Sequence, residues 1–206
     1  QEYLEFFFKA CDQPWKQIGE AQELLISKAF NKGDELRITN DDGTNITMQL
    51  GKDERAKVEH HTFANSVIGR NMPGSEMFSG PVRDSLNGTI VAKGNFMYDY
   101  SGKNRHMKDI TLKFENGRIV DAKAAEGQEW LEAIISQEDE GKECVDKETG
   151  KKFIMTKDHP RFEGARHVGE IGIGTNPFIQ QHLVNRLLVE KVSGSFHVAL
   201  GKAYDN

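Results

Sequence analysis

The stretch DITLKFENGRIVDAKA, residues 109–124, decides the fold class that we expect for this chain. Apolar and polar residues alternate on both sides of the dipeptide Asn116-Gly117, and a period of two is typical of strands with one buried face. Asn-Gly favours two-residue hairpin turns, because both turn positions need a positive φ. The stretch therefore predicts an antiparallel hairpin.

Further strands are predicted on either side of this hairpin. Residues 88–100 alternate in the same way, and residues 34–51 read as two strands around an Asp42-Gly43 turn. Residues 195–204 predict a strand near the end of the chain. The sequence shows no continuous alternation of strands and helices of the kind that parallel sheets require.

Three segments have the apolar spacing of helices. Residues 4–33 are expected to form a helix that Gly33 ends, and residues 180–194 a helix that Gly194 ends. The apolar positions of the first segment include Ile18, Ala21, Leu24, Leu25 and Ala29. Residues 125–137 place Trp130, Leu131, Ile134 and Ile135 on one face. Strand pairs interspersed with helices predict an α+β (mixed α/β) fold, with a mixed β-sheet and flanking helices.

Composition limits the classes of function. The 206 residues are 37% hydrophobic and carry a net charge of −5, which permits a sizeable core. Without a basic stripe, nucleic acid is not an expected partner, and no apolar run is long enough to span a bilayer. Cys11 is expected in the core, and Cys144 in an exposed, charged excursion over residues 138–152. Free thiols and mild acidity predict a cytoplasmic protein.

The segment RNMPGSEMFSGP, residues 70–81, reads as a rigid, irregular loop around one carboxylate, Glu76. A solvated acid is the simpler interpretation of this loop alone. However, Pro73 and Pro81 restrict the loop, and a restricted loop suits a metal ligand, because binding then orders little that was free.

Two later segments carry further candidate ligands. Glu170 lies in HVGEIGIGTNP, residues 167–177, whose glycines match neither a dinucleotide fingerprint nor a P-loop. Glu190 and His197 lie in the segment 189–204, where a lone histidine before Val-Ala-Leu is ordinarily a core residue. Taken together, three carboxylates and one imidazole on short apolar segments match the ligands of a divalent metal pair.

The motifs NMPGSEMFSGP, ARHVGEIGIGTNP and VEKVSGSFHVALGKAY occur in this order, after an opening segment from about Tyr3. In that order they resemble the cocatalytic-metal aminopeptidases typified by aminopeptidase T, aminopeptidase S and PepS, also called thermophilic metalloproteases. The resemblance implies the fold of their C-terminal catalytic region over residues 1–206. Family members continue to a terminal His-x-Asp pair and carry an N-terminal domain, so we expect a fragment that lacks both.

The resemblance also assigns roles to individual residues. It makes Glu76, Glu170, Glu190 and His197 metal ligands, and Tyr204 a catalytic residue that donates to the oxyanion. Glu76 is the candidate base. Two positions depart from the family pattern: the glycine before Glu76 comes one place early, and Val189 replaces an aspartate before Glu190. His167 is a candidate supporting residue, and the pair Arg161 and Arg166 are candidates for a substrate carboxylate.

The implied reaction is hydrolysis of the first peptide bond of short peptides with a free N-terminus, by water activated between two divalent ions (Zn, Co or Mn). Homodimers are implied as well. Two alternatives stay open. One is an iron-dependent, ring-cleaving dioxygenase of the same fold, although iron sites favour histidines beside one carboxylate. The other is a non-catalytic domain that binds metal weakly, since the terminal pair is missing.

Overall fold

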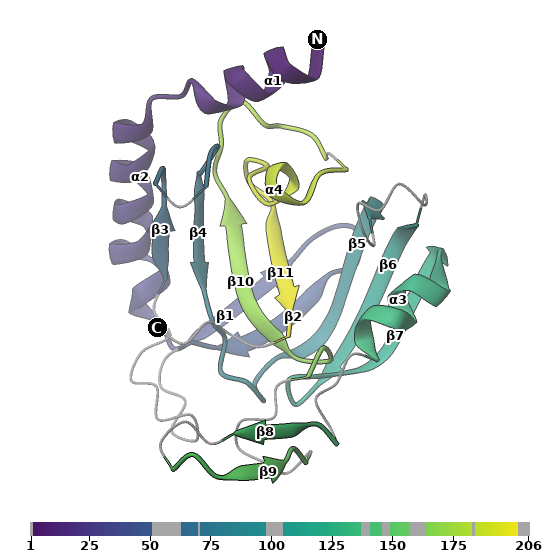
Figure 1. The fold of residues 1–206 in the computed structure, drawn as a ribbon. Helices are drawn as coiled ribbons and strands as arrows, with labels where there is room; N and C mark the ends of the chain where they lie inside the picture. Colours follow the sequence, from purple (N-terminus) through teal and green to yellow (C-terminus); the bar gives the residue numbers. More distant parts are fainter. Residues whose placement is uncertain are drawn as a thin grey trace.

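The computed structural model describes residues 2–50, 63–69, 71–97, 105–136, 141–145, 149–156, 164–182 and 184–201 (Figure 1). The helices are α1 (Glu2–Cys11), α2 (Trp15–Lys28), α3 (Gln128–Ile135) and α4 (Arg186–Val189), with a 3-10 turn η1 (Phe30–Lys32). The strands are β1 (Glu35–Thr39), β2 (Asn45–Gln49), β3 (Ala64–Ser66), β4 (Glu76–Ser79), β5 (Asn87–Met97), β6 (His106–Glu115), β7 (Arg118–Glu126), β8 (Glu143–Val145), β9 (Lys152–Ile154), β10 (Val168–Gly174) and β11 (Phe196–Leu200).

A five-stranded sheet with the order β1-β2-β5-β6-β7 contains the hairpins that the sequence predicts. β6 and β7 pair as antiparallel neighbours around Asn116 and Gly117, whose φ angles are 49° and 76°. β1 and β2 pair around the Asp42-Gly43 turn, where Gly43 has a φ of 105°. Both turns have the positive φ that Asn and Gly tolerate. These predictions are confirmed.

A four-stranded sheet with the order β11-β10-β4-β3 joins segments that are far apart in the sequence. β10 pairs with β11 on one side and with β4 on the other, and both pairings are antiparallel. Helix α2 lies along β3 and β4, at the left of Figure 1. The α+β class is therefore confirmed. Each pairing between described strands is antiparallel, so the sheets are antiparallel rather than mixed as expected.

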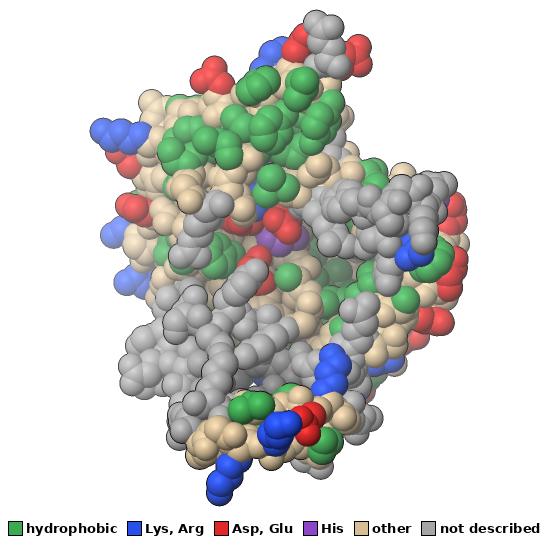
Figure 2. All heavy atoms as spheres, viewed as in Figure 1, with side chains coloured by type: hydrophobic (Ala, Val, Ile, Leu, Met, Phe, Trp, Pro, Cys, Tyr) green, Lys and Arg blue, Asp and Glu red, His purple; other side chains and the backbone are tan. Residues whose placement is uncertain are grey.

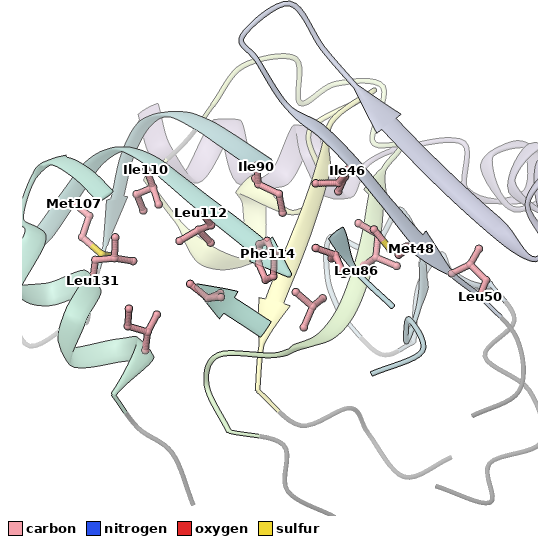
Figure 3. Close-up of a cluster of buried hydrophobic side chains, with 14 of the residues drawn as sticks. Ile46, Met48, Leu50, Leu86, Ile90, Met107, Ile110, Leu112, Phe114 and Leu131 are labelled. Atoms are coloured by element: carbon pink, nitrogen blue, oxygen red, sulfur yellow. The ribbon is translucent and has the colours of Figure 1, made fainter. Parts of the chain in front are cut away.

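One apolar core lies between the two sheets and α3 (Figure 3). The five-stranded sheet contributes residues such as Ile46, Leu112 and Phe114, and the four-stranded sheet contributes Met77 and Ile171. Leu131 and Ile135 of α3 are buried, and Trp130 and Ile134 are half-buried against the same core, as predicted. A smaller cluster joins α1 to the segment 179–192.

The N-terminal helix differs from its prediction. It is interrupted after Cys11, because Pro14 cannot supply a backbone donor, and α2 ends at Lys28 rather than at Gly33. Leu24 and Leu25 are exposed, while Gln22 is buried. Ala21 and Ala29 are exposed as well. In Figure 2, apolar side chains gather on the surface over α1.

Three other local predictions are wrong. The segment 180–194 forms four helical residues, α4, rather than a full helix. The charged segment 138–152 is exposed at its described residues apart from the half-buried Cys144, as expected, but it contains β8, which pairs with β9, in place of an irregular loop. Cys11 is half-buried rather than in the core, although burial still raises the pKa of its thiol.

Candidate metal centre

Glu76 is the first residue of strand β4, so the expected irregular loop ends just before it. Gly74 passes so close to Val67 that a Cβ at position 74 would lie 1.5 Å from the Val67 carbonyl oxygen. Ser75 follows with a φ of 90°. These two residues turn the chain tightly and start the strand with the Glu76 side chain buried.

Strand β10 presents two different faces. Ile171 and Ile173 belong to the apolar core, whereas Glu170, Gly172 and Gly174 lie on the opposite face at every second position. In the pairing register, Gly174 lies opposite Glu76 of β4, and Gly172 lies opposite His197 of β11. The register therefore brings candidate ligands from three strands to one face of the four-stranded sheet.

Gly172 makes room for the imidazole of His197. A Cβ at position 172 would lie 2.2 Å from His197 Nε2 and 2.3 Å from Cε1, which no real side chain tolerates. A glycine is thus needed at position 172 so that the His197 imidazole can approach the strand closely. The glycine-rich segment forms strand β10 rather than a phosphate-binding loop.

Glu76, Glu170 and His197 form a compact cluster, in which one ligand atom of each lies within 4.8 Å of the others. His197 Nε2 is 3.4 Å from Glu76 Oε2 and 3.6 Å from Glu170 Oε1. Acidic and histidine side chains show in a hollow over β10 and β11 in Figure 2. The structure thus brings three of the predicted ligands together, and their role as metal ligands stays a prediction.

Two ligand atoms of the cluster lack hydrogen bonds. Within the part of the chain that the structure describes, Glu76 Oε2 and His197 Nε2 are buried and have no hydrogen-bond partner. The two atoms lie 3.4 Å apart without the geometry of a hydrogen bond. Buried polar atoms are nearly always satisfied, so atoms that converge without partners fit a bound cation.

Glu190 does not join the three-residue cluster directly. It is linked to the cluster through Lys191, whose Nζ lies 2.6 Å from Glu76 Oε1 and 3.2 Å from Glu190 Oε2. The Lys191 side chain is fully buried, and the Glu190 side chain is 37% exposed. The sequence reasoning missed Lys191, because a lysine beside a glutamate at the end of an expected helix reads as a solvated residue.

A model of the thermophilic metalloprotease family (M29) matches residues 3–146, which include Glu76. The chain belongs to this family. Among curated relatives of this M29 chain, aminopeptidase AmpS of Bacillus subtilis is 29% identical over 138 residues, or 65% of this chain and 26% of the relative. Aminopeptidase 2 of Geobacillus stearothermophilus is 26% identical over 196 residues, or 92% of this chain and 40% of the relative. The chain thus spans less than half the length of these relatives.

Solved structures show that the M29 chain shares its fold with two enzymes. AmpT from Thermus thermophilus superposes with a TM-score of 0.63 at 19% identity, over 97% of this chain and 44% of AmpT. A 2,5-dihydroxypyridine dioxygenase from Pseudomonas putida superposes with a TM-score of 0.55 at 17% identity, over 92% of this chain and 49% of the dioxygenase. At these identities the likeness concerns the fold alone.

Several predicted residues lie elsewhere. Tyr204 and Arg161 are outside the described residues. His167 is buried, and its backbone forms an antiparallel β-bridge with Arg118 of β7. Both residues line a surface pocket of about 450 Å³, whose lining includes none of the three clustered ligands. Arg166 donates to the Ile119 carbonyl oxygen. The exposed His182 contacts the Asn95 carbonyl oxygen, and His106 is half-buried beside Glu126.

A buried polar network fixes the backbone under Glu76. Gln22 Nε2 of α2 donates to the Glu76 carbonyl oxygen at 3.2 Å and to Thr175 Oγ1 at 2.8 Å. Thr175 Oγ1 also contacts Ser75 Oγ at 2.9 Å, and the Thr175 N–H donates to the Ser75 carbonyl oxygen. These bonds tie α2, β4 and the end of β10 together, so the position of Glu76 is set before any ligand binds.

Within the described residues, none of the helices has both the length and the apolar composition needed to cross a membrane.

Proposed function

We propose that this chain carries the metal site of an aminopeptidase that removes the N-terminal residue from short peptides. The observation that carries the proposal is the cluster of Glu76, Glu170 and His197, whose ligand atoms converge within 4.8 Å on one face of the four-stranded sheet. Membership of the M29 family and similarity to aminopeptidases support the same reaction class.

The donor set fits a hard or borderline divalent ion, since it combines two carboxylates with one imidazole. Zinc, cobalt and manganese all suit these ligands. When bound, such an ion polarises the scissile carbonyl and lowers the pKa of a water molecule toward neutrality. Glu76, Glu170 and His197 would hold the ion. The pairing register of their three strands sets the spacing between these ligands.

The protein residues then handle the proton and the developing charge. Glu76 is the candidate base by family resemblance, but Lys191 holds its Oε1 at 2.6 Å. The remaining oxygen, Oε2, cannot both bind the ion and accept the water proton, so the two roles compete at this carboxylate. Glu170 is 23% exposed, more than Glu76 or His197, so it is the clustered side chain most open to solvent. Tyr204 is proposed to donate its hydroxyl proton to the oxyanion, as the family resemblance implies.

The family resemblance implies two ions rather than one. Glu76, Glu170 and His197 account for a first ion. In the two-ion arrangement that the resemblance implies, Glu190 is also a ligand, so a second ion would bind between Glu76 and Glu190. The space between these two carboxylates holds Lys191 Nζ. Cytoplasmic location and a homodimer stay predictions.

The dioxygenase alternative is less well supported by the ligands. Non-haem iron oxygenases typically use two histidines and one carboxylate, whereas this cluster contains one histidine and two carboxylates. The fold is compatible with both activities, so the choice rests on the donor set.

The proposal is tested on the protein after treatment with chelator and reloading with zinc, cobalt or manganese. We expect metal-dependent release of leucine from a leucyl dipeptide and no release from its N-acetylated counterpart. Glu170→Gln is expected to lose the activity and to weaken metal binding, while the exposed Glu129→Gln serves as the matched control. Absence of cleavage with every metal would move the assignment to the dioxygenase or to a non-catalytic domain.

A further inference from the structure

Lys191 is a fully buried cation at the edge of the candidate metal centre. Lysine is almost never fully buried unless it is paired. Its ammonium contacts two carboxylates, Glu76 Oε1 at 2.6 Å and Glu190 Oε2 at 3.2 Å. The charge of Lys191 is therefore an integral part of the site.

The backbone holds Lys191 in this position. The Lys191 N–H donates to the Leu188 carbonyl oxygen, and the Lys191 carbonyl oxygen accepts from the Asn176 N–H. The segment also packs on Gly174, where a Cβ would lie 2.2 Å from the Val192 carbonyl oxygen and 2.9 Å from the Lys191 carbonyl carbon. Gly174 pairs directly with Glu76, so the ammonium is placed over this carboxylate by the strand register.

The ammonium lies where a second metal ion would have to bind. An ion shared by Glu76 and Glu190 would sit about 2.0–2.2 Å from their oxygens, and Lys191 Nζ already contacts those same oxygens. The two cations exclude each other by volume and by charge. We propose that Lys191 replaces the second metal ion and that the chain binds a single divalent ion between Glu76, Glu170 and His197. This inference rests on the proposed metal site.

The charges of the site agree with one ion. Glu76, Glu170 and Glu190 carry three negative charges, which one ammonium and one divalent ion balance. Two divalent ions beside the ammonium would leave an excess of two positive charges in a largely buried site, which a low dielectric makes costly. Lys191 also keeps Glu76 Oε1 occupied, which directs Oε2 toward His197.

Counting the bound ions tests the inference. The full chain is stripped with chelator and titrated with Zn²⁺ by calorimetry, and its metal content is measured after gel filtration with a weak competing chelator. We expect one Zn²⁺ per chain for the wild type and for Lys191→Arg, which keeps the cation. Lys191→Ala, which frees the two carboxylates, is expected to bind two. The double variant Lys191→Ala/Glu190→Gln is expected to return to one.

Each outcome separates this inference from the proposed function. Two Zn²⁺ in the wild type would overturn the inference and leave the metal site standing, and so would one Zn²⁺ in folded Lys191→Ala. No Zn²⁺ in the wild type would overturn both proposals. If Lys191→Ala fails to fold, Lys191→Gln replaces it, since the neutral amide fills more of the space and can still accept or donate hydrogen bonds.

Discussion

The five-stranded sheet and the four-stranded sheet share one apolar core but differ in how their strands are joined and in what their outer faces carry. Two tight turns, at Asp42-Gly43 and Asn116-Gly117, join neighbouring strands of the first sheet. The second sheet joins β4, β10 and β11 from distant parts of the chain, and its outer face carries the clustered ligands.

This difference suggests a division of roles between the sheets. The first sheet supplies more of the core's buried apolar side chains than the second sheet does, so its substitutions should change stability first. The second sheet places glycines and charged groups where close approach matters, so its substitutions should change metal binding first.

Phe114→Ala should have the largest effect on stability. Phe114 is 1% exposed in the core of the five-stranded sheet, and truncation of a buried phenylalanine costs about 3–5 kcal/mol. We expect a loss of this size in urea unfolding, with an unchanged number of bound Zn²⁺ per folded chain. Val120→Ala, at an exposed position of the neighbouring strand β7, should change stability by less than about 0.5 kcal/mol. Equal effects of the two variants would contradict the division.

Gly172→Ala should have the opposite effect to Phe114→Ala: it should weaken Zn²⁺ binding and leave the fold unchanged. The new methyl group would lie 2.2 Å from His197 Nε2, so the imidazole has to move away from Glu76 and Glu170. Displacing a metal ligand in this way is expected to weaken Zn²⁺ binding by about 10–100-fold, while the far-ultraviolet circular dichroism stays that of the wild type. Zn²⁺ affinity is measured by competition with a chelator.

Gly33→Ala is the matched control for this substitution. Gly33 has an extended φ of −118°, and the nearest atom to an added Cβ is 3.7 Å away. We expect unchanged Zn²⁺ affinity and a slight gain in stability, because alanine has fewer unfolded conformations. Unchanged affinity in Gly172→Ala as well would remove His197 from the site.

The turns of the five-stranded sheet are predictable from the sequence because their determinants are local. Asn116-Gly117 specifies its own geometry within two residues, and Gly43 supplies the positive φ in the turn between β1 and β2. By contrast, Leu24 and Leu25 fit the apolar pattern of a helix but are exposed, and Gln22 takes the buried position. It is buried because its amide reaches the Glu76 carbonyl oxygen and Thr175, which no local pattern reveals.

Part of the candidate site was predictable from the sequence. The prediction came from motifs that resemble a known family, and not from the spacing of the residues alone. Glu76, Glu170 and His197 were assigned by family resemblance, and the strand register then explains why they meet. Lys191 was missed because the segment around it is shaped by contacts with Gly174 and Asn176 of another segment. Among the described residues of the segment 180–194, the helix is confined to α4, and Lys191 follows its C-cap residue, Glu190.

The smallest expected effect concerns an exposed ion pair of the five-stranded sheet, which contrasts with the buried Lys191 pair. Lys113 Nζ lies 2.8 Å from Glu115 Oε1, and both side chains are more than half exposed. The hydrogen bond to Glu115, together with its negative charge, raises the pKa of Lys113, and Asp121 adds a weaker effect. Solvent screens such pairs, so they contribute little to stability.

Glu115→Gln should therefore lower the pKa of Lys113 without a measurable change in urea unfolding at neutral pH. Because the folded-state pKa is raised, the contribution of the pair is complete below the unfolded-state pKa and is lost only as the pH rises through the folded-state pKa. Between about pH 6 and 9 the small contribution of this pair to stability should thus stay constant with pH. NMR titration of the Lys113 side chain measures the pKa, and Asp121→Asn should shift it less than Glu115→Gln. A stability loss comparable to that of Phe114→Ala would mean that surface charges, and not the apolar core, hold this sheet together.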